Sequence, residues 1–202
     1  NGISAQGNPM LEANPGGAPC NVLAMLEKLG KKTAFIGKVG NDMFGTQLKN
    51  AVEEVGIDTR NLVIDNEVHT TLAFVHTYPD GDRDFSFYRN PGADMMLTKD
   101  EIQEDLIRDS RIFHFGTLSS THEGVREATR DAIEVAKEAG CIVSFDPNLR
   151  PPLWKSLDDA KAEIEYGLGK CDILKISDNE VEFLFGTTDY DKGAALLKEK
   201  YN

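Results

Sequence analysis

The sequence predicts an α/β protein with a mostly parallel sheet and a small antiparallel insertion. Short apolar segments alternate with amphipathic helical segments from residue 21 to 56 and again from residue 112 to 200, the order typical of β-α-β units. Between these stretches, strand-like segments follow one another with little helix, and an Asp80-Gly81 dipeptide joins two of them as in a hairpin. The 202 residues suffice for one large domain.

The first β-α-β stretch begins with a helix over residues 21–29, whose apolar residues recur at helical spacing. Asn21 is the expected N-cap and Gly30 the expected C-terminal stop. A strand over residues 33–36 and a helix over residues 44–55 follow, and each ends at a glycine, Gly37 and Gly56.

The antiparallel insertion consists of strands over residues 61–64, 70–77 and 84–88, with a turn over residues 78–82. In the second strand the side chains alternate between two faces, with Leu72, Phe74 and His76 on one and Ala73, Val75 and Thr77 on the other. So small a sheet does not fold well alone. We expect it to form a lid that excludes water from a site on the α/β core.

The second β-α-β stretch has strands over residues 112–115, 141–145 and 172–176, and helices over residues 123–139, 158–168, 179–185 and 191–200. Ligands of such folds gather at the carboxyl ends of parallel strands. The loops after Phe115, Phe145 and Ile176 are therefore the expected binding loops.

Composition limits the possible partners and setting. The net charge of −12 argues against a nucleic-acid binder, although a few arginines and lysines can still form a local anion site. No apolar run is long enough to span a bilayer, and residues 1–7 lack a signal-peptide core. The three cysteines form no CxxC pair. We expect a cytoplasmic protein without nucleic-acid or membrane partners.

Four segments carry candidate chemistry, and each also has a structural interpretation. Gly16-Gly17 before a helix would let a ligand approach the backbone, or would form a plain turn. Arg89 at a strand end could bind a hydroxyl, carboxylate or phosphate, or could be a solvated surface residue. Asp146-Pro147-Asn148-Leu149-Arg150 follows a buried strand and either binds a ligand or builds a turn. Glu180 could order a Mg²⁺ water, or could close a capping box with Ser177.

Taken together, four motifs resemble those of the ribokinase-like (PfkB) carbohydrate kinases, and within that family the fructokinases of bacteria and plants. They are residues 16–21 (GGAPCN), 38–45 (KVGNDMFG), 88–94 (YRNPGAD) and 146–150 (DPNLR). The resemblance implies a three-layer αβα sandwich with a β lid. It also implies transfer of the ATP γ-phosphate to a sugar hydroxyl, with Mg²⁺ and possibly K⁺, in a homodimer that pairs through the lid.

Matching motif positions imply the site residues. The sugar would contact Gly16, Gly17, Asn21, Tyr88, Arg89 and Arg150. Asn148 and Lys175 would lie on the phosphate and nucleotide side, and Glu180 would be the acidic end of the magnesium motif, in which Ser177 replaces the family's Asn. The lid would comprise residues 1–15 and 61–92, and the core residues 16–60 and 93–202.

Two family motifs do not occur in the sequence: an upstream strand with a sugar-binding Asp, and the Gly-Ala-Gly-Asp that carries the catalytic base. We therefore expect a chain truncated at both ends, with the base beyond Asn202. The resemblance leaves two alternatives open, a 2-keto-3-deoxygluconate kinase and a non-catalytic sugar-binding module of the same fold. A Rossmann oxidoreductase is disfavoured because no GxGxxG fingerprint is present.

Overall fold

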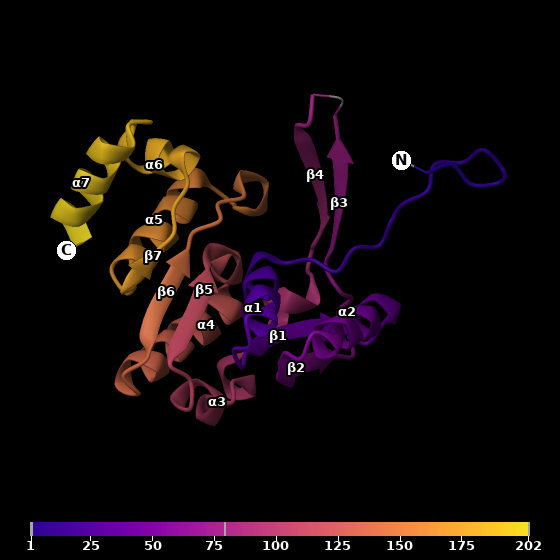
Figure 1. Cartoon of the computed structure of the whole chain (residues 1–202), viewed down its shortest axis with the longest axis horizontal. Coiled ribbons are helices and arrows are strands. Elements are labelled where there is room, and N and C mark those ends of the chain that lie inside the picture. The colour runs from indigo at the N-terminus through magenta and orange to yellow at the C-terminus, as the bar shows by residue number, and fades with distance from the viewer. Residues whose placement is uncertain (1, 79, 202) are drawn as a thin grey trace.

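The computed structural model describes residues 2–78 and 80–201, and it contains two parallel sheets and one antiparallel hairpin (Figure 1). Strands β1 (Ala34–Gly40) and β2 (Asp58–Asp65) pair in parallel, joined by helix α2 (Met43–Glu54). Strands β5 (Ile112–Gly116), β6 (Ile142–Asp146) and β7 (Ile173–Leu174) form the second parallel sheet, in that order. The predicted α/β class with mostly parallel pairing is confirmed.

The strand over residues 61–64 was predicted to belong to the antiparallel insertion, and that prediction is wrong. These residues lie in β2, where Ile36 pairs with Asn61 and Val39 with Ile64. The helical crossover α2 returns the chain beside β1, which is how parallel neighbours must be connected. The buried Asn61 side chain also holds β2 on the core, because it donates to Glu101 O at 2.8 Å and accepts from Gln103 N at 2.8 Å.

The antiparallel part is a single hairpin of β3 (Leu72–Thr77) and β4 (Arg83–Tyr88), which projects away from the parallel sheets (Figure 1). Its register pairs Leu72 with Tyr88 and Val75 with Phe85, so the predicted alternation of faces is confirmed. Pro79, in the predicted turn, lies outside the described residues. In the described part of the N-terminal segment the strand-type pairing is one isolated bridge between Ile3 and Pro9, so no strand there extends the hairpin.

Helix α1 (Ala18–Lys28) contacts both β1 and β5 and so connects the two parallel sheets. A single parallel sheet was expected, but among the described residues no strand pairs β1 with β5. In the described part of the chain, four 3₁₀ turns lie in the connections: η1 (Ala93–Met96), η2 (Lys99–Glu101), η3 (Thr117–Ser120) and η4 (Pro151–Leu153). Of these, η3 follows the carboxyl end of β5 and η4 follows the loop after β6.

The second sheet is covered by helices α3 (Glu104–Arg108), α4 (Glu123–Glu138) and α5 (Leu157–Leu168), and the chain continues into α6 (Asp178–Phe185) and α7 (Tyr190–Tyr201). Strand β7 is shorter than the predicted residues 172–176, because only Ile173 and Leu174 pair with β6 in ladder register. Lys175 N still donates to Phe145 O at 2.9 Å, which keeps the following loop beside β6.

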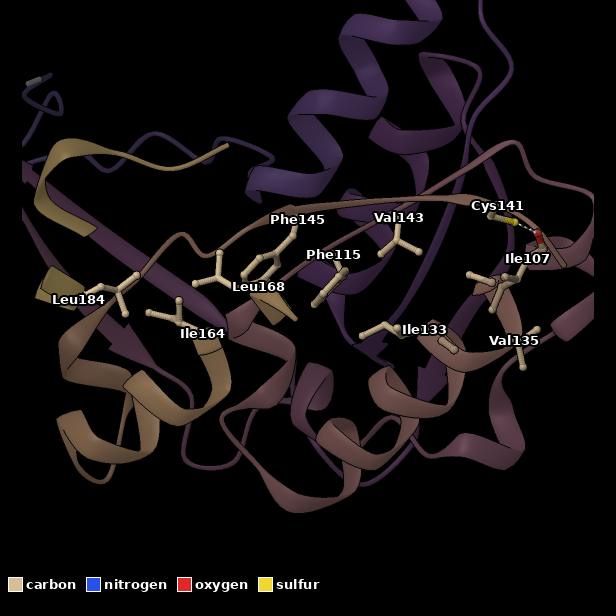
Figure 2. Packing of buried hydrophobic residues seen from close by; sticks show 12 residues of the cluster. Ile107, Phe115, Ile133, Val135, Cys141, Val143, Phe145, Ile164, Leu168 and Leu184 are labelled. Carbon is tan, nitrogen blue, oxygen red and sulfur yellow. Dashed lines mark hydrogen bonds between the residues drawn. The ribbon is translucent and has the colours of Figure 1, made fainter. Parts of the chain in front are cut away.

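The main core lies between the β5–β6 sheet and helices α4 and α5 (Figure 2). Phe145 is fully buried and stacks on Phe115 with ring centroids 4.6 Å apart. Ile133 and Ile164 contribute fully buried side chains from α4 and α5. Each such side chain stabilises the fold by about 1.5–3 kcal/mol through removal of apolar surface from water. This packing fixes the carboxyl ends of β5 and β6, where the predicted binding loops begin.

Candidate functional site

The glycine pair starts helix α1. Gly17 is the N-cap with φ +119°, a conformation that favours glycine, and Pro19 occupies the first turn. The prediction that Asn21 caps this helix is wrong, because the helix begins at Ala18 and Asn21 N already donates to Gly17 O at 3.0 Å. Burial raises the pKa of the neighbouring Cys20 thiol to about 11, so this thiol stays protonated at neutral pH.

A pocket of about 360 Å³ lies between the hairpin and the η4 turn. Phe85 and Phe87 of β4 and Arg89 after it point to this side of the hairpin, as their alternate positions require. Asn90, Met95, Pro152 and Leu153 complete the lining. The expected lid therefore meets the loop after β6, as the sequence predicts.

Arg89 lines this pocket, but most of its donors are directed into the protein. Its side chain is only 4% exposed. The guanidinium forms a two-point contact with Asp94 Oδ2, from Nε at 2.8 Å and from Nη2 at 2.6 Å. It also donates to Thr121 Oγ1 at 2.7 Å and to Leu118 O at 3.0 Å. The interpretation of Arg89 as a solvated surface residue is therefore wrong.

Tyr88 lies on the opposite face of the hairpin from Arg89. It lines a second pocket of about 400 Å³ together with Leu72, His69 and Asp42. Its ring packs edge-on against Phe74 at 5.2 Å between centroids, and 67% of the residue remains exposed. Tyr88 and Arg89, although adjacent in sequence, thus do not share one pocket.

The loop after β6 carries Asn148 and Arg150. Asn148 has a left-handed backbone with φ +46°, which Asn tolerates better than most residues. The Arg150 guanidinium carbon lies 5.9 Å from the Phe85 ring centroid, and Nη1 donates to Leu149 O at 3.0 Å. Arg150 therefore approaches the hairpin from the core side. Together, Arg89, Arg150 and Phe85 bring positive charge and an aromatic face to the same cleft.

Lys175 stands at the end of β7 beside the same loop. Its ammonium lies 3.2 Å from Asp146 Oδ1, and its side chain is 66% exposed. An ion pair so open to water contributes little to stability. Lys175 is therefore available to an anion that approaches the carboxyl ends of β6 and β7.

Glu180 is 5% exposed and has both carboxylate oxygens occupied. Oε1 accepts from Leu149 N at 2.8 Å, and Oε2 accepts from Ser177 N at 2.8 Å and Ser177 Oγ at 2.9 Å. These contacts form the predicted capping box and also tie α6 to the loop after β6. Within residues 2–78 and 80–201, no group of three or more His, Cys, Asp or Glu side chains could hold a metal ion.

The predicted site residues thus fall into four places. Arg89 lines the pocket below the hairpin and Arg150 lies beside the Phe85 ring of that pocket, whereas Asn148, Lys175 and Glu180 belong to the loops after β6 and β7. Gly16, Gly17 and Asn21 lie at the start of α1, outside the described lining of both pockets. Tyr88 belongs to the outer face of the hairpin.

Sequence reasoning missed Asp42 as an anchor of the hairpin. Asp42 caps α2 by accepting from Gly45 N at 2.8 Å, and it also accepts from Thr70 N and Thr70 Oγ1, each at 2.8 Å. Burial alone would raise the pKa of Asp42, but these hydrogen bonds outweigh it and hold the pKa at about 2. Its position just before an amphipathic helix signals the cap, whereas the bonds to Thr70 are long-range and invisible in the sequence.

Comparison with known proteins identifies the family. The family model described as "pfkB family carbohydrate kinase" matches residues 6–202. The chain belongs to the PfkB carbohydrate kinases. The ribokinase-like fold expected from the sequence is thereby confirmed.

Individual relatives are similar over most of this chain. It is 45% identical over 195 residues to fructokinase-2 of Solanum lycopersicum, covering 96% of this chain and 60% of the relative. A fructokinase structure from Xylella fastidiosa with bound ATP is 36% identical at a TM-score of 0.82, covering 92% of this chain and 57% of the other. A Vibrio cholerae fructokinase bound to fructose, ADP and calcium is 30% identical at a TM-score of 0.81, covering 92% and 59%. The chain thus spans about 60% of the relatives it matches.

None of the described helices combines the length and the apolar character needed to cross a bilayer.

Proposed function

We propose that this chain forms the sugar-binding side of an ATP-dependent fructokinase. The observation that carries the proposal is the pocket between the hairpin and the loop after β6, which Arg89 lines and Arg150 borders. Relatives named fructokinase, and structures that contain fructose with ADP or contain ATP, support the sugar and the phosphate donor.

In this reaction the sugar and the nucleotide would bind at different parts of the site. Phosphoryl transfer asks a protein mainly to position two reactants and to neutralise charge in a dry site. The sugar would lie under Phe85 and Phe87 with its hydroxyls toward Arg150 and toward the remaining Nη1 N–H of Arg89. The contacts with Gly16, Gly17 and Asn21 that the resemblance implies would require the hairpin to approach the start of α1, because these residues lie outside the described lining of this pocket. The hairpin would exclude water from that side.

The nucleotide phosphates would approach the loops after β6 and β7. Lys175 is the exposed cation there, and Asn148 presents a polar side chain on a fixed left-handed turn. Both belong to loops at the carboxyl ends of parallel strands, where the fold class places ligands.

Mg²⁺ fits the described residues only as an ion carried by the phosphates. Mg²⁺ keeps several waters and takes one or two carboxylates at nucleotide sites. An ionised carboxylate can accept about four hydrogen bonds and Glu180 accepts three from described protein groups, so we propose that Glu180 orients a metal-bound water and does not ligate the ion directly. When bound, the ion would neutralise phosphate charge. A monovalent cation such as K⁺ is part of the same proposal, supported by a related structure that contains potassium.

The catalytic base is proposed to lie outside these 202 residues, because the Gly-Ala-Gly-Asp motif does not occur in the sequence. A coupled ADP-release assay tests the function on the chain extended to the length of its relatives, with fructose, glucose and 2-keto-3-deoxygluconate as acceptors. We expect turnover with fructose. A preference for 2-keto-3-deoxygluconate would change the substrate, and no turnover with any sugar would reject the kinase.

We also propose a homodimer formed through the outer face of the hairpin and a cytoplasmic setting. Phe74 and Tyr88 are 38% and 67% exposed on that face and pack edge-on, as rigid aromatic side chains at interfaces do. Sedimentation of the wild-type chain and of Tyr88→Ser tests the dimer, and a monomeric wild type would refute it.

The cytoplasmic setting is proposed from the cysteines. Cys20, Cys141 and Cys171 are free thiols, which suits a reducing compartment.

A further inference from the structure

The base of the hairpin is tied to the core by a chain of polar side chains, in which Arg89 and Asp94 of the motif over residues 88–94 join Thr71 and Thr121, which lie outside the four motifs. Thr71, just before β3, donates from Oγ1 to Asp94 Oδ1. Asp94 Oδ2 in turn receives the two-point contact from Arg89, just after β4. One carboxylate therefore joins the two ends of the hairpin.

The same chain continues into the loop after β5. Arg89 Nη1 donates to Thr121 Oγ1 at 2.7 Å and Nη2 to Leu118 O at 3.0 Å, while Thr121 Oγ1 donates to Leu118 O at 2.9 Å. Thr121 is 9% exposed, so these bonds lie largely out of water. The η3 turn in this loop is itself fixed to the loop after β6, because Thr117 Oγ1 donates to Pro147 O at 2.6 Å.

A second tie holds the leading strand to the other parallel sheet. Thr70 Oγ1 donates to Asp42 Oδ1 at 2.8 Å and accepts from Gly40 N at 3.0 Å, at the end of β1. The hairpin base thus spans both parallel sheets, with Asp42 on one side and Thr121 on the other. Packing at the base is tight, because a Cβ at Gly92 would lie 1.8 Å from Thr71 Oγ1 and 2.8 Å from Asp94 Oδ1.

We propose that Thr71, Asp94 and Thr121 are positioning residues that act through Arg89 as one unit and set the angle of the hairpin over the site. Removing one partner of a hydrogen bond to a charged group costs more free energy than removing one partner of a neutral hydrogen bond. Loss of either threonine hydroxyl therefore loosens the whole hairpin rather than one contact. Neither threonine is among the described residues that line the 360 Å³ pocket, so each acts on the site only through the hairpin.

Hydrogen exchange on the chain itself tests this unit without any assay of activity. Thr71→Val and Thr121→Val remove one hydroxyl each at nearly constant shape, and Thr77→Val makes the same change at an exposed position of β3. We expect amides of β3 and β4 to exchange at least about 10 times faster in each of the first two variants, because loss of one hydrogen bond to a charged group costs about 1.5 kcal/mol or more. Amides of β5 and β6 should keep the wild-type rate, and Thr77→Val should change neither set.

The double variant decides whether the residues act together. If the four side chains form one unit, Thr71→Val/Thr121→Val exchanges hardly faster than the stronger single variant, because either change already releases the chain. Independent contacts would instead multiply, and the double variant would exchange at least about 100 times faster than wild type. Multiplied effects, unchanged hairpin exchange, or equal acceleration in β5 and β6 would each overturn the proposal.

A second measurement rests on the proposed function. Thr71→Val and Thr121→Val should weaken fructose binding in calorimetry by about tenfold, a loss of about 1.4 kcal/mol, and Thr71→Ser and Thr121→Ser should restore it. Unweakened binding with a loosened hairpin would refute the positioning role. If wild-type chain binds no fructose, the proposed function fails while the exchange result still decides the unit.

Discussion

Replacing Glu180 by Gln tests whether this carboxylate holds the loop after β6. The wild-type side chain is 5% exposed and accepts from Leu149 N, Ser177 N and Ser177 Oγ. A glutamine offers one oxygen in place of two, so its amide nitrogen must face either the Leu149 or the Ser177 N–H. One charged hydrogen bond is lost, about 1.5–3 kcal/mol. Loss of the negative charge in the first turn of α6 adds about 0.3–1 kcal/mol.

We therefore expect Glu180→Gln to lower the free energy of unfolding by about 2–4 kcal/mol, a large share of the stability of a typical domain. Urea unfolding with linear extrapolation measures it in metal-free buffer. Glu182→Gln, on the exposed side of the same helix, is the matched control and should change stability by less than about 0.5 kcal/mol. If Glu180→Gln is as stable as Glu182→Gln, the carboxylate does not hold the loop, and a purely metal-related role would be the better account.

Three further predictions concern the anchors and the phosphate side. Asp42 has a depressed pKa of about 2, so its carboxylate stabilises the fold by about 2 kcal/mol above pH 4, and this contribution is lost as the pH falls toward 2. In urea unfolding, the difference in stability between wild type and Asp42→Asn should therefore shrink between pH 4 and pH 2. A difference that does not depend on pH would contradict this. Gly45→Ala places a Cβ 2.0 Å from Gly40 O and should lower the free energy of unfolding by at least about 2 kcal/mol. The control is Gly124→Ala, at a helical glycine whose Cβ would meet nothing closer than 4.0 Å, and it should stabilise the fold by about 0.5–1 kcal/mol. Similar melting temperatures for the two variants would refute the packing at α2. Lys175→Met should change the free energy of unfolding by less than about 1 kcal/mol, because the ion pair of Lys175 with Asp146 is exposed. The same variant should weaken ATP binding at least about tenfold in calorimetry. Unchanged ATP affinity would show that Lys175 does not contact the phosphates.

Local patterns in the sequence were sufficient for most elements of the fold. Helical spacing located α2, α4 and α5, and alternation located the two faces of the hairpin. The sequence could not show which strands pair, because a strand over residues 61–64 can pair with a neighbouring strand in either direction. Its partner β1 is chosen by the α2 crossover and by the bonds of Asn61 to Glu101 and Gln103, some 40 residues away.

In the site, too, contacts between residues near in sequence could be predicted, and contacts between distant residues could not. The capping box of Ser177 and Glu180 spans three residues and was visible as one of two interpretations. The contacts of Arg89 with Thr121 and Leu118 cross about 30 residues, so the sequence could show an arginine at a strand end but not that its donors are held inside the protein. The side of the hairpin on which each residue lies follows from alternation, which separates Tyr88 from Arg89.

Calorimetric titration of the chain with fructose, without nucleotide, tests directly whether a sugar site lies beneath the hairpin. We expect one fructose per chain, with affinity reduced at least about tenfold by Arg150→Ala, which removes the guanidinium next to Phe85. Arg111→Ala serves as the control, because Arg111 is exposed at the opposite end of β5. Absence of fructose binding by a folded chain, or equal affinity in the two variants, would contradict a sugar site beneath the hairpin.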